Sequence, residues 1–276
     1  MIILRNMINF VSFYQGLHTC SFPLLTTLIV SQCMKLKVIA PEFFNVQETH
    51  GSVDIDTLYG RFRIRYNASG IEYYVGELIL EGLPKLTQLM DESSQDHTSF
   101  QNFIILRVRD CNMLKNLVPS SISFQNLEML TVSRCHGMLN LISSQTAKSM
   151  NRLKEMKISA CQRLTEIISD QLEGDHDTES GEIVLSGLKT LEIYMLPSLT
   201  SFNLGKYMIG FPELESLVVN GCSEMQCFSV HGIISTPKLN ELRLDGKTTK
   251  RVDNNTIDIN SIIKHHFKNQ AGYCGD

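Results

Sequence analysis

The chain has 276 residues, a formal net charge of −4 and an isoelectric point near 6.1. This balance excludes a protein that binds nucleic acid or an anionic membrane through its overall charge, so a charge-driven partner must meet a local patch. No stretch of about 18 consecutive apolar residues occurs, and the sequence therefore predicts no membrane span.

One frame of apolar residues recurs along the chain. It runs aliphatic, two variable residues, aliphatic, one variable, aliphatic, two variable and usually cysteine, and two further apolar residues follow at steps of three. The paired apolar residues point to one face of a short strand, and the later ones turn the chain inward once per coil. Full copies begin at Leu25, Val75, Phe103, Leu127, Leu153, Leu188 and Leu214, and an eighth stops early after Leu239, Leu242 and Leu244.

This period is typical of leucine-rich repeats, whose coils each need their neighbours to cover the core. The sequence therefore predicts an α/β leucine-rich repeat solenoid, or horseshoe. We expect short parallel strands on its concave face and irregular or short helical segments on its convex side.

The frame divides the chain into three parts. We expect an irregular segment at 1–19, a repeat domain of about eight coils at 20–245 and a solvated tail at 246–276. Within the repeats, the acidic segment 169–182 cannot bury a core and is predicted to be a loop on the convex side. Segment 51–74 is either a degenerate coil or a separate hairpin, because apolar residues alternate there with arginines.

Five of the eight cysteines share one position of the repeat. Stacked coils would place them roughly 4.8 Å apart, which leaves disulfide pairing open. Leucine fills the same position in two other copies, so the position suits a small buried hydrophobe, which a reduced cysteine is. We expect structural thiols and neither a disulfide framework nor a metal site. The five are Cys33, Cys111, Cys135, Cys161 and Cys222.

No catalytic or cofactor-binding residues are predicted, because the chain has no phosphate-binding loop, no nucleophile elbow and no metalloprotease motif. Asp175, His176 and Asp177 are expected to be solvated in the acidic segment. His265 and His266 are adjacent, so they project in different directions and are also expected to be solvated. Reduced thiols and the lack of a convincing signal peptide indicate the cytoplasm, with the nucleus or a membrane surface as alternatives.

Side chains between and just after the strand leucines are predicted to line the concave face, which is the usual binding surface of a solenoid. A basic zone of arginine and lysine crosses the third to fifth copies there, and an acidic residue and a tyrosine follow. The alternative is that exposed strand positions are simply polar. The predicted partner-binding residues are Arg107, Arg109, Arg134, Lys157, Glu192, Tyr194 and Arg243.

Three copies carry a family resemblance: LKTLEIYMLPSL at 188–199, FPELESLVVNGCSEM at 211–225 and STPKLNELRL at 235–244. Residues 20–245 resemble the C-terminal repeats of plant intracellular disease-resistance proteins of the coiled-coil, nucleotide-binding (NB-ARC) class. The resemblance implies a non-catalytic module of plant defence. Such a module senses a pathogen effector or a guarded host protein, or restrains a nucleotide-binding domain.

Two features set limits to this resemblance. Members of the family carry an ATP/ADP-binding domain ahead of the repeats, whereas this chain has no phosphate-binding loop, so we expect a fragment, a truncated gene product or a stand-alone repeat protein. The alternative is a substrate-recruiting adaptor of the F-box type in ubiquitination, whose repeats also bear cysteines. Those repeats continue differently after the cysteine than this chain does after Cys111 and Cys222.

Overall fold

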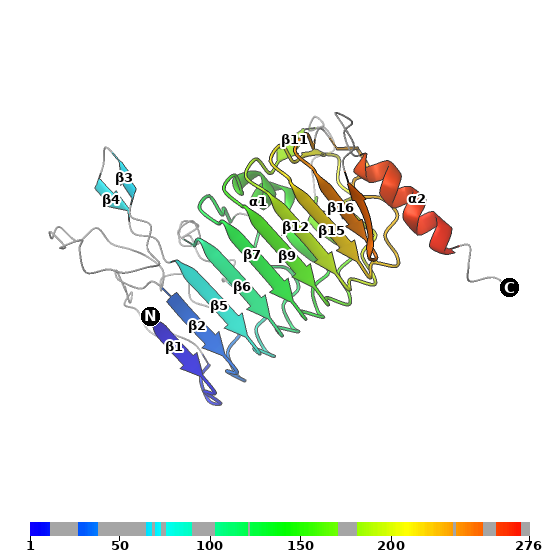
Figure 1. Cartoon of the computed structure of the whole chain (residues 1–276). Coiled ribbons are helices and arrows are strands. Elements are labelled where there is room, and N and C mark those ends of the chain that lie inside the picture. The colour runs from blue at the N-terminus through cyan, green and yellow to red at the C-terminus, as the bar shows by residue number, and fades with distance from the viewer. Residues whose placement is uncertain are drawn as a thin grey trace.

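The computed structural model describes residues 1–11, 27–37, 65–67, 70–72, 76–89, 103–120, 122–170, 181–233, 236–250 and 258–271. Within these ranges, one ten-stranded sheet runs along the molecule and is parallel except for its last pair (Figure 1). The predicted leucine-rich repeat solenoid is confirmed. The strands in spatial order are β1 (Ile2–Arg5), β2 (Thr27–Ser31), β5 (Glu77–Glu81), β6 (Ile105–Arg109), β7 (Met129–Ser133), β9 (Glu155–Ser159), β12 (Thr190–Tyr194), β15 (Ser216–Asn220), β16 (Glu241–Leu244) and β17 (Lys247–Lys250).

The paired apolar residues of the frame build the core by stacking in register. Leu78 pairs with Leu106 in the next strand, and Leu106 pairs with Leu130 in the one after. All three side chains are fully buried. Since neighbouring strands lie about 4.8 Å apart, every leucine is covered by the coils on either side of it.

A left-handed turn follows each parallel strand of this sheet. The turn residue has φ between 45° and 68° in every coil, yet only Gly82 and Gly221 are glycines. In Asp110, for example, the turn directs the backbone N–H to the carbonyl of Ser133 in the next coil, at 3.1 Å. The coil geometry therefore imposes a conformation that costs most L-residues about 1–2 kcal/mol.

A second and smaller parallel sheet closes the core from the other side. Its strands are β8 (Asn140–Ser143), β10 (Glu166–Ser169) and β13 (Ser201–Asn203). The last apolar residue of the frame, such as Ile167 or Phe202, lies in these strands and is fully buried. The same side holds the short helix α1 (Ser144–Ser149) and the strand pair β11 (Glu182–Val184) and β14 (Met208–Gly210). The short helix was expected, whereas the strands were not.

The N-terminal segment departs from the prediction of an irregular 1–19. Residues 2–5 form β1, which pairs in parallel with β2, so that Ile2 lies opposite Leu28 and Leu4 opposite Val30. Both β1 side chains are only partly buried, because a coil covers them on one side alone. The apolar spacing of the frame continues through Met7 and Phe10, and Phe10 packs against the core, so this segment begins as the other coils do.

The C-terminal tail also differs from the prediction. It contains β17 and the helix α2 (Ile259–Ala271) instead of solvated chain. Asp258 caps this helix by accepting the Ser261 N–H at 3.1 Å, and Ile259, Ile263 and Phe267 form its buried stripe.

The prediction that both histidines are solvated is wrong for one of them. The His266 side chain is only 11% exposed, and its Nε2 lies 2.9 Å from Asp245 Oδ2, while His265 is exposed. Their being adjacent on a helix explains this, because neighbouring residues point to different sides.

The structure favours the hairpin for part of 51–74. Strands β3 (Arg65–Asn67) and β4 (Gly70–Glu72) pair with each other in antiparallel fashion and belong to neither larger sheet. The rest of that segment and residues 171–180, with Asp175, His176 and Asp177, lie outside the described residues.

Truncating a central leucine should destabilise the solenoid strongly. We expect Leu130→Ala to lower the free energy of unfolding by about 2–5 kcal/mol, because two coils wall the resulting cavity. Thr131→Ala, its neighbour on the outward face, is the control and should cost less than about 0.5 kcal/mol. Urea titration followed by circular dichroism measures both, and equal losses would contradict the packing described above.

The left-handed turns give a second stability test. Ala160 has φ 53°, so Ala160→Gly should raise the free energy of unfolding by about 0.5–1 kcal/mol, the strain relieved less the entropy that glycine adds to the unfolded chain. Gly82→Ala should lower it by about 1 kcal/mol. A Cβ on Gly82 would meet nothing closer than 3.5 Å, so backbone conformation alone would cause the loss. Thermal midpoints that rise in both variants or fall in both would contradict backbone strain at these turn positions.

Candidate partner-binding face

The outward side of the ten-stranded sheet, here called the open face, carries six of the seven predicted site residues. In one row, strand pairing links Arg107, Thr131, Lys157 and Glu192, and continues through Val218 to Arg243. A second row links Arg109, Ser133, Ser159, Tyr194 and Asn220. The seventh, Arg134, occupies the left-handed turn after β7, at the edge of this face. Six of the predicted residues therefore lie in two adjacent rows on one side of the sheet, and Arg134 lies beside them.

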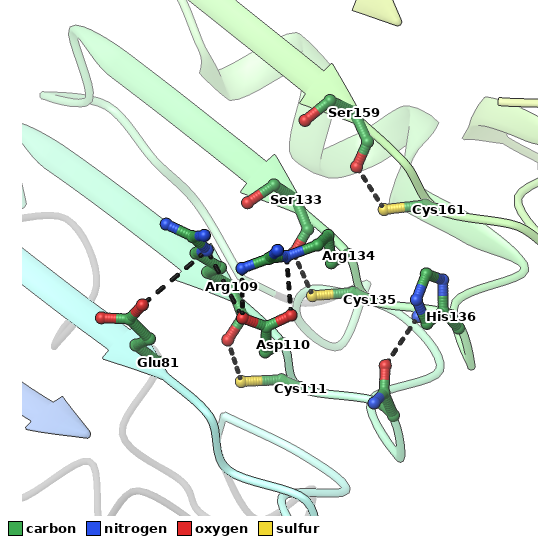
Figure 2. Close-up of polar contacts among 11 residues, drawn as sticks. Glu81, Arg109, Asp110, Cys111, Ser133, Arg134, Cys135, His136, Ser159 and Cys161 are labelled. Carbon is green, nitrogen blue, oxygen red and sulfur yellow. Dashed lines mark hydrogen bonds and ion pairs between the residues drawn. The ribbon is translucent and has the colours of Figure 1, made fainter. Parts of the chain in front are cut away.

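Acidic side chains accompany the arginines of the predicted basic zone. The Arg107 guanidinium forms an ion pair with Glu77, whose side chain is almost completely buried. Figure 2 shows Arg109 and Arg134 converging on Asp110. Arg109 Nε lies 3.4 Å from Asp110 Oδ2 and 3.7 Å from Glu81 Oε1, and Arg134 Nε lies 2.9 Å from Asp110 Oδ1.

The same pairing extends to the other cations of the open face. Lys157 Nζ lies 2.7 Å from Glu155 and 3.5 Å from Glu192, and the hydrogen bond that this lysine donates to Glu155 raises its pKa. Arg243 contacts Glu241 at 3.0 Å. The zone that the sequence indicated as basic is therefore charge-compensated.

Sequence reasoning missed these acidic partners, although part of the signal was present. Glu155 precedes Lys157 by two residues, and Glu241 precedes Arg243 by two, a spacing that puts both side chains on the same face of a strand. The pair between Glu77 and Arg107 joins two coils, so it depends on the register between strands and has no local signal.

Tyr194 is the aromatic side chain of the second row. Burial raises the pKa of its phenol, and the negative charge of Glu192 raises it further. The side chain is half-buried between Ser159 and Asn220 in the flanking strands. Tyrosine with this mixture of exposure and packing is a common anchor at protein interfaces.

The predicted burial of the repeat cysteines is confirmed. Each thiol points to the backbone carbonyl two residues earlier, as in Cys111 to Arg109 at 3.4 Å and Cys161 to Ser159 at 3.4 Å (Figure 2). Contact with Cys111 and burial raise the pKa of Cys135 to about 12. The Cys135 thiol therefore stays protonated at neutral pH, where a thiolate would be needed for nucleophilic attack.

The described residues include no cluster of three or more His, Cys, Asp or Glu side chains placed to hold a metal ion. In the same part of the chain, no helix is long and apolar enough to cross a membrane.

A family model described as plant disease resistance protein RPS2-like, leucine-rich repeats, matches the chain at residues 25–124 and 120–246. A search of curated proteins and a search of solved structures gave no match. The matched ranges include all the predicted site residues and all the parallel strands from β2 to β16.

The buried thiols predict a loss of stability at alkaline pH. The folded-state pKa is about 12 for Cys135 and about 11 for Cys222, raised from an ordinary value of 9.0. Their contribution is therefore fully present below pH 9 and is lost as the pH rises from about 9 toward 12. By pH 10.5 we expect a loss of about 1–2 kcal/mol for each thiol.

Urea midpoints measured at pH 8 and pH 10.5 test this for the wild type and Cys222→Ala. The variant should be less stable at pH 8 but should lose less between the two pH values. An identical pH dependence would show that other groups cause the alkaline loss.

Proposed function

Because the chain belongs to the RPS2-like leucine-rich repeat family of plant disease resistance proteins, we propose that it is the protein-recognition module of an intracellular immune receptor. In this proposal it acts in the cytoplasm without catalysis. It binds a pathogen effector or a guarded host protein, or it restrains a nucleotide-binding domain. The family match is to disease-resistance repeats, and it gives no support to a ubiquitination adaptor.

The open face is the observation that carries the proposal. Its outward side chains are held in two registered rows, since the alternating leucines of the same strands are fully buried. A partner that binds such a face does not have to order a loop, which reduces the entropic cost of association. Arginine and tyrosine, two residue types enriched at interface hot spots, lie within these rows.

Charge compensation defines the kind of partner that suits this face. Five cations in and beside the two rows are matched by six carboxylates: Arg107, Arg109, Arg134, Lys157 and Arg243 with Glu77, Glu81, Asp110, Glu155, Glu192 and Glu241. The face therefore has little net field to steer an acidic molecule. We propose that its partner is a protein surface of mixed charge, with an association rate that depends only weakly on salt.

Capture by a separately expressed nucleotide-binding domain of an RPS2-like protein tests this function. We expect Tyr194→Ala combined with Lys157→Ala to weaken capture at least about tenfold, since an interface anchor is commonly worth about 2 kcal/mol. Lys238→Ala is the matched control, because Lys238 also forms an ion pair, with Glu213, but lies outside the two rows. Arg107 is a poor choice for substitution, since it neutralises the buried Glu77.

The outcomes separate the possible roles of the face. Capture lost in the double variant and kept in the control supports the open face as the binding surface. Capture equal in all three proteins would mean that the exposed positions are simply polar. A steep fall of capture with salt would contradict the mixed-charge partner.

A further inference from the structure

The edge of the solenoid at which the parallel strands end, here called the turn edge, carries a second set of cations. The arrowheads of these strands in Figure 1 point to it. After a strand the chain makes a tight turn between buried residues, as where the Leu36 N–H donates to the Cys33 carbonyl at 3.3 Å. The same turn recurs at Leu86, Leu114 and Leu164. Side chains between the buried residues therefore project into solvent, in rows about 4.8 Å apart.

Five cations occupy these exposed positions in the coils of β2, β5, β6 and β9. Backbone hydrogen bonds hold neighbouring coils together there. The Thr87 N–H donates to the Lys37 carbonyl at 3.1 Å, and further along the edge the Leu139 N–H donates to that of Lys115, also at 3.1 Å. From the coil of β2 to that of β9 the cations span about 19 Å. They are Lys35, Lys37, Lys85, Lys115 and Arg163, here called the turn-edge strip.

The cations of the strip form no ion pair with a carboxylate of the described residues, and Lys35 contacts Asn9 Oδ1 at 2.9 Å instead. From the coil of β2 to that of β9, no exposed position of these turns holds an acidic residue. The nearby carboxylate of Asp110 already contacts Arg109 and Arg134. The strip therefore keeps a positive local field, unlike the charge-compensated open face.

Lysines at the opposite edge, where the strands begin, are paired across coils. There Lys154 contacts Glu128 at 2.9 Å, and such a pairing recurs in two later coils. At the turn edge, Lys35 and Lys85 instead occupy the same position of neighbouring turns. Like charges one coil spacing apart repel each other, so an anionic partner would stabilise the strip.

Exposed apolar side chains lie among these cations. Met34, beside Lys35, is 50% exposed, and Leu139 is 41% exposed. Met113, which holds the turn position of Lys35 and Lys85 in the next coil, is 54% exposed. Unbranched methionine side chains adapt to apolar partners of different shape. A partner of this edge therefore gains from apolar groups as well as from negative charge.

We propose that the turn-edge strip binds an acidic protein segment that also carries apolar side chains. A single-stranded nucleic acid would need aromatic side chains for base stacking, and the exposed turn positions of these coils hold none. An anionic membrane lying along the edge would also meet the turns after β12 and β15, which hold Glu224 and no cation. The strip is separate from the two rows of the open face, and the proposal does not depend on the function of that face.

Fluorescence anisotropy of a labelled peptide of Glu-Glu-Leu repeats, titrated with the full chain, tests the strip. We expect saturable binding that weakens severalfold when NaCl is raised from about 50 to about 300 mM, because salt screens exposed charges. Lys37→Ala, Lys85→Ala and Lys115→Ala combined should weaken it at least about tenfold. Lys85→Ala alone should cause a smaller loss, and it remains informative if the triple variant does not fold. A Glu-Glu-Ser peptide should bind severalfold more weakly.

The matched control removes the same charge from the opposite edge. It combines Lys154→Ala, Lys189→Ala and Lys238→Ala, whose lysines are exposed and paired with glutamates. This variant should bind the peptide within about twofold of the wild type, because exposed ion pairs contribute little to stability. Equal weakening in the two triple variants would overturn the proposal, since any loss of positive charge would then suffice.

Three further outcomes would also overturn it. The first is no saturable binding of the Glu-Glu-Leu peptide below about 1 mM. The second is equally tight binding of the Glu-Glu-Ser peptide, which would show that the exposed methionines contribute nothing. The third is binding of oligothymidine or of phosphatidylserine vesicles that is as tight as that of the peptide and is lost in the strip variant, which would assign the edge to a nucleic acid or to a membrane.

Discussion

Register between neighbouring coils is the constraint on which this structure depends. A leucine in β6 is buried because leucines in β5 and β7 lie directly beside it, and no coil can bury its apolar residues alone. The same register sets the positions of the outward side chains. The open face is therefore a consequence of core packing: once Leu106 and Val108 are fixed between their neighbours, Arg107 and Arg109 must point outward in rows with the residues of adjacent strands.

The two ends of the sheet meet this constraint in different ways. At the C-terminal end, Asp245 supplies part of what a following coil would supply, because its Oδ1 accepts the N–H of Gly221 at 2.7 Å. In other coils the corresponding N–H bonds to a strand carbonyl of the next coil, as Asp110 does with Ser133. Asp245 is itself held by His266 of α2, and Asn260 of the same helix bonds to the backbone of Phe228 and Ser229. The helix thus closes the end of the core.

The sequence predicted the features that recur in every coil and missed those that depend on contacts between coils. The rows of leucines and the buried cysteines could be predicted, because a fixed spacing states which residues share a face. The pairing of Arg107 with Glu77 could not, because it joins coils about one repeat apart through a register that the local sequence does not state. The strands of the second sheet were missed because they are short and carry only part of an apolar pattern. In the tail, Ile259, Ile263 and Phe267 follow the i, i+4, i+8 spacing of one helix face, so the sequence does carry a signal for α2.

Because α2 covers one end of the core, the two ends of the sheet differ. At β1 the sheet ends in a parallel strand with partly buried Ile2 and Leu4, so a further coil could in principle stack there in register. Beyond β16 the antiparallel strand β17 breaks the parallel order, and the buried stripe of α2 covers the core. Copies that stacked head to tail would need two matching apolar ends, and among the described residues α2 covers the core at one of them. The helix therefore disfavours head-to-tail stacking of copies into open-ended filaments, which exposed strand edges otherwise promote.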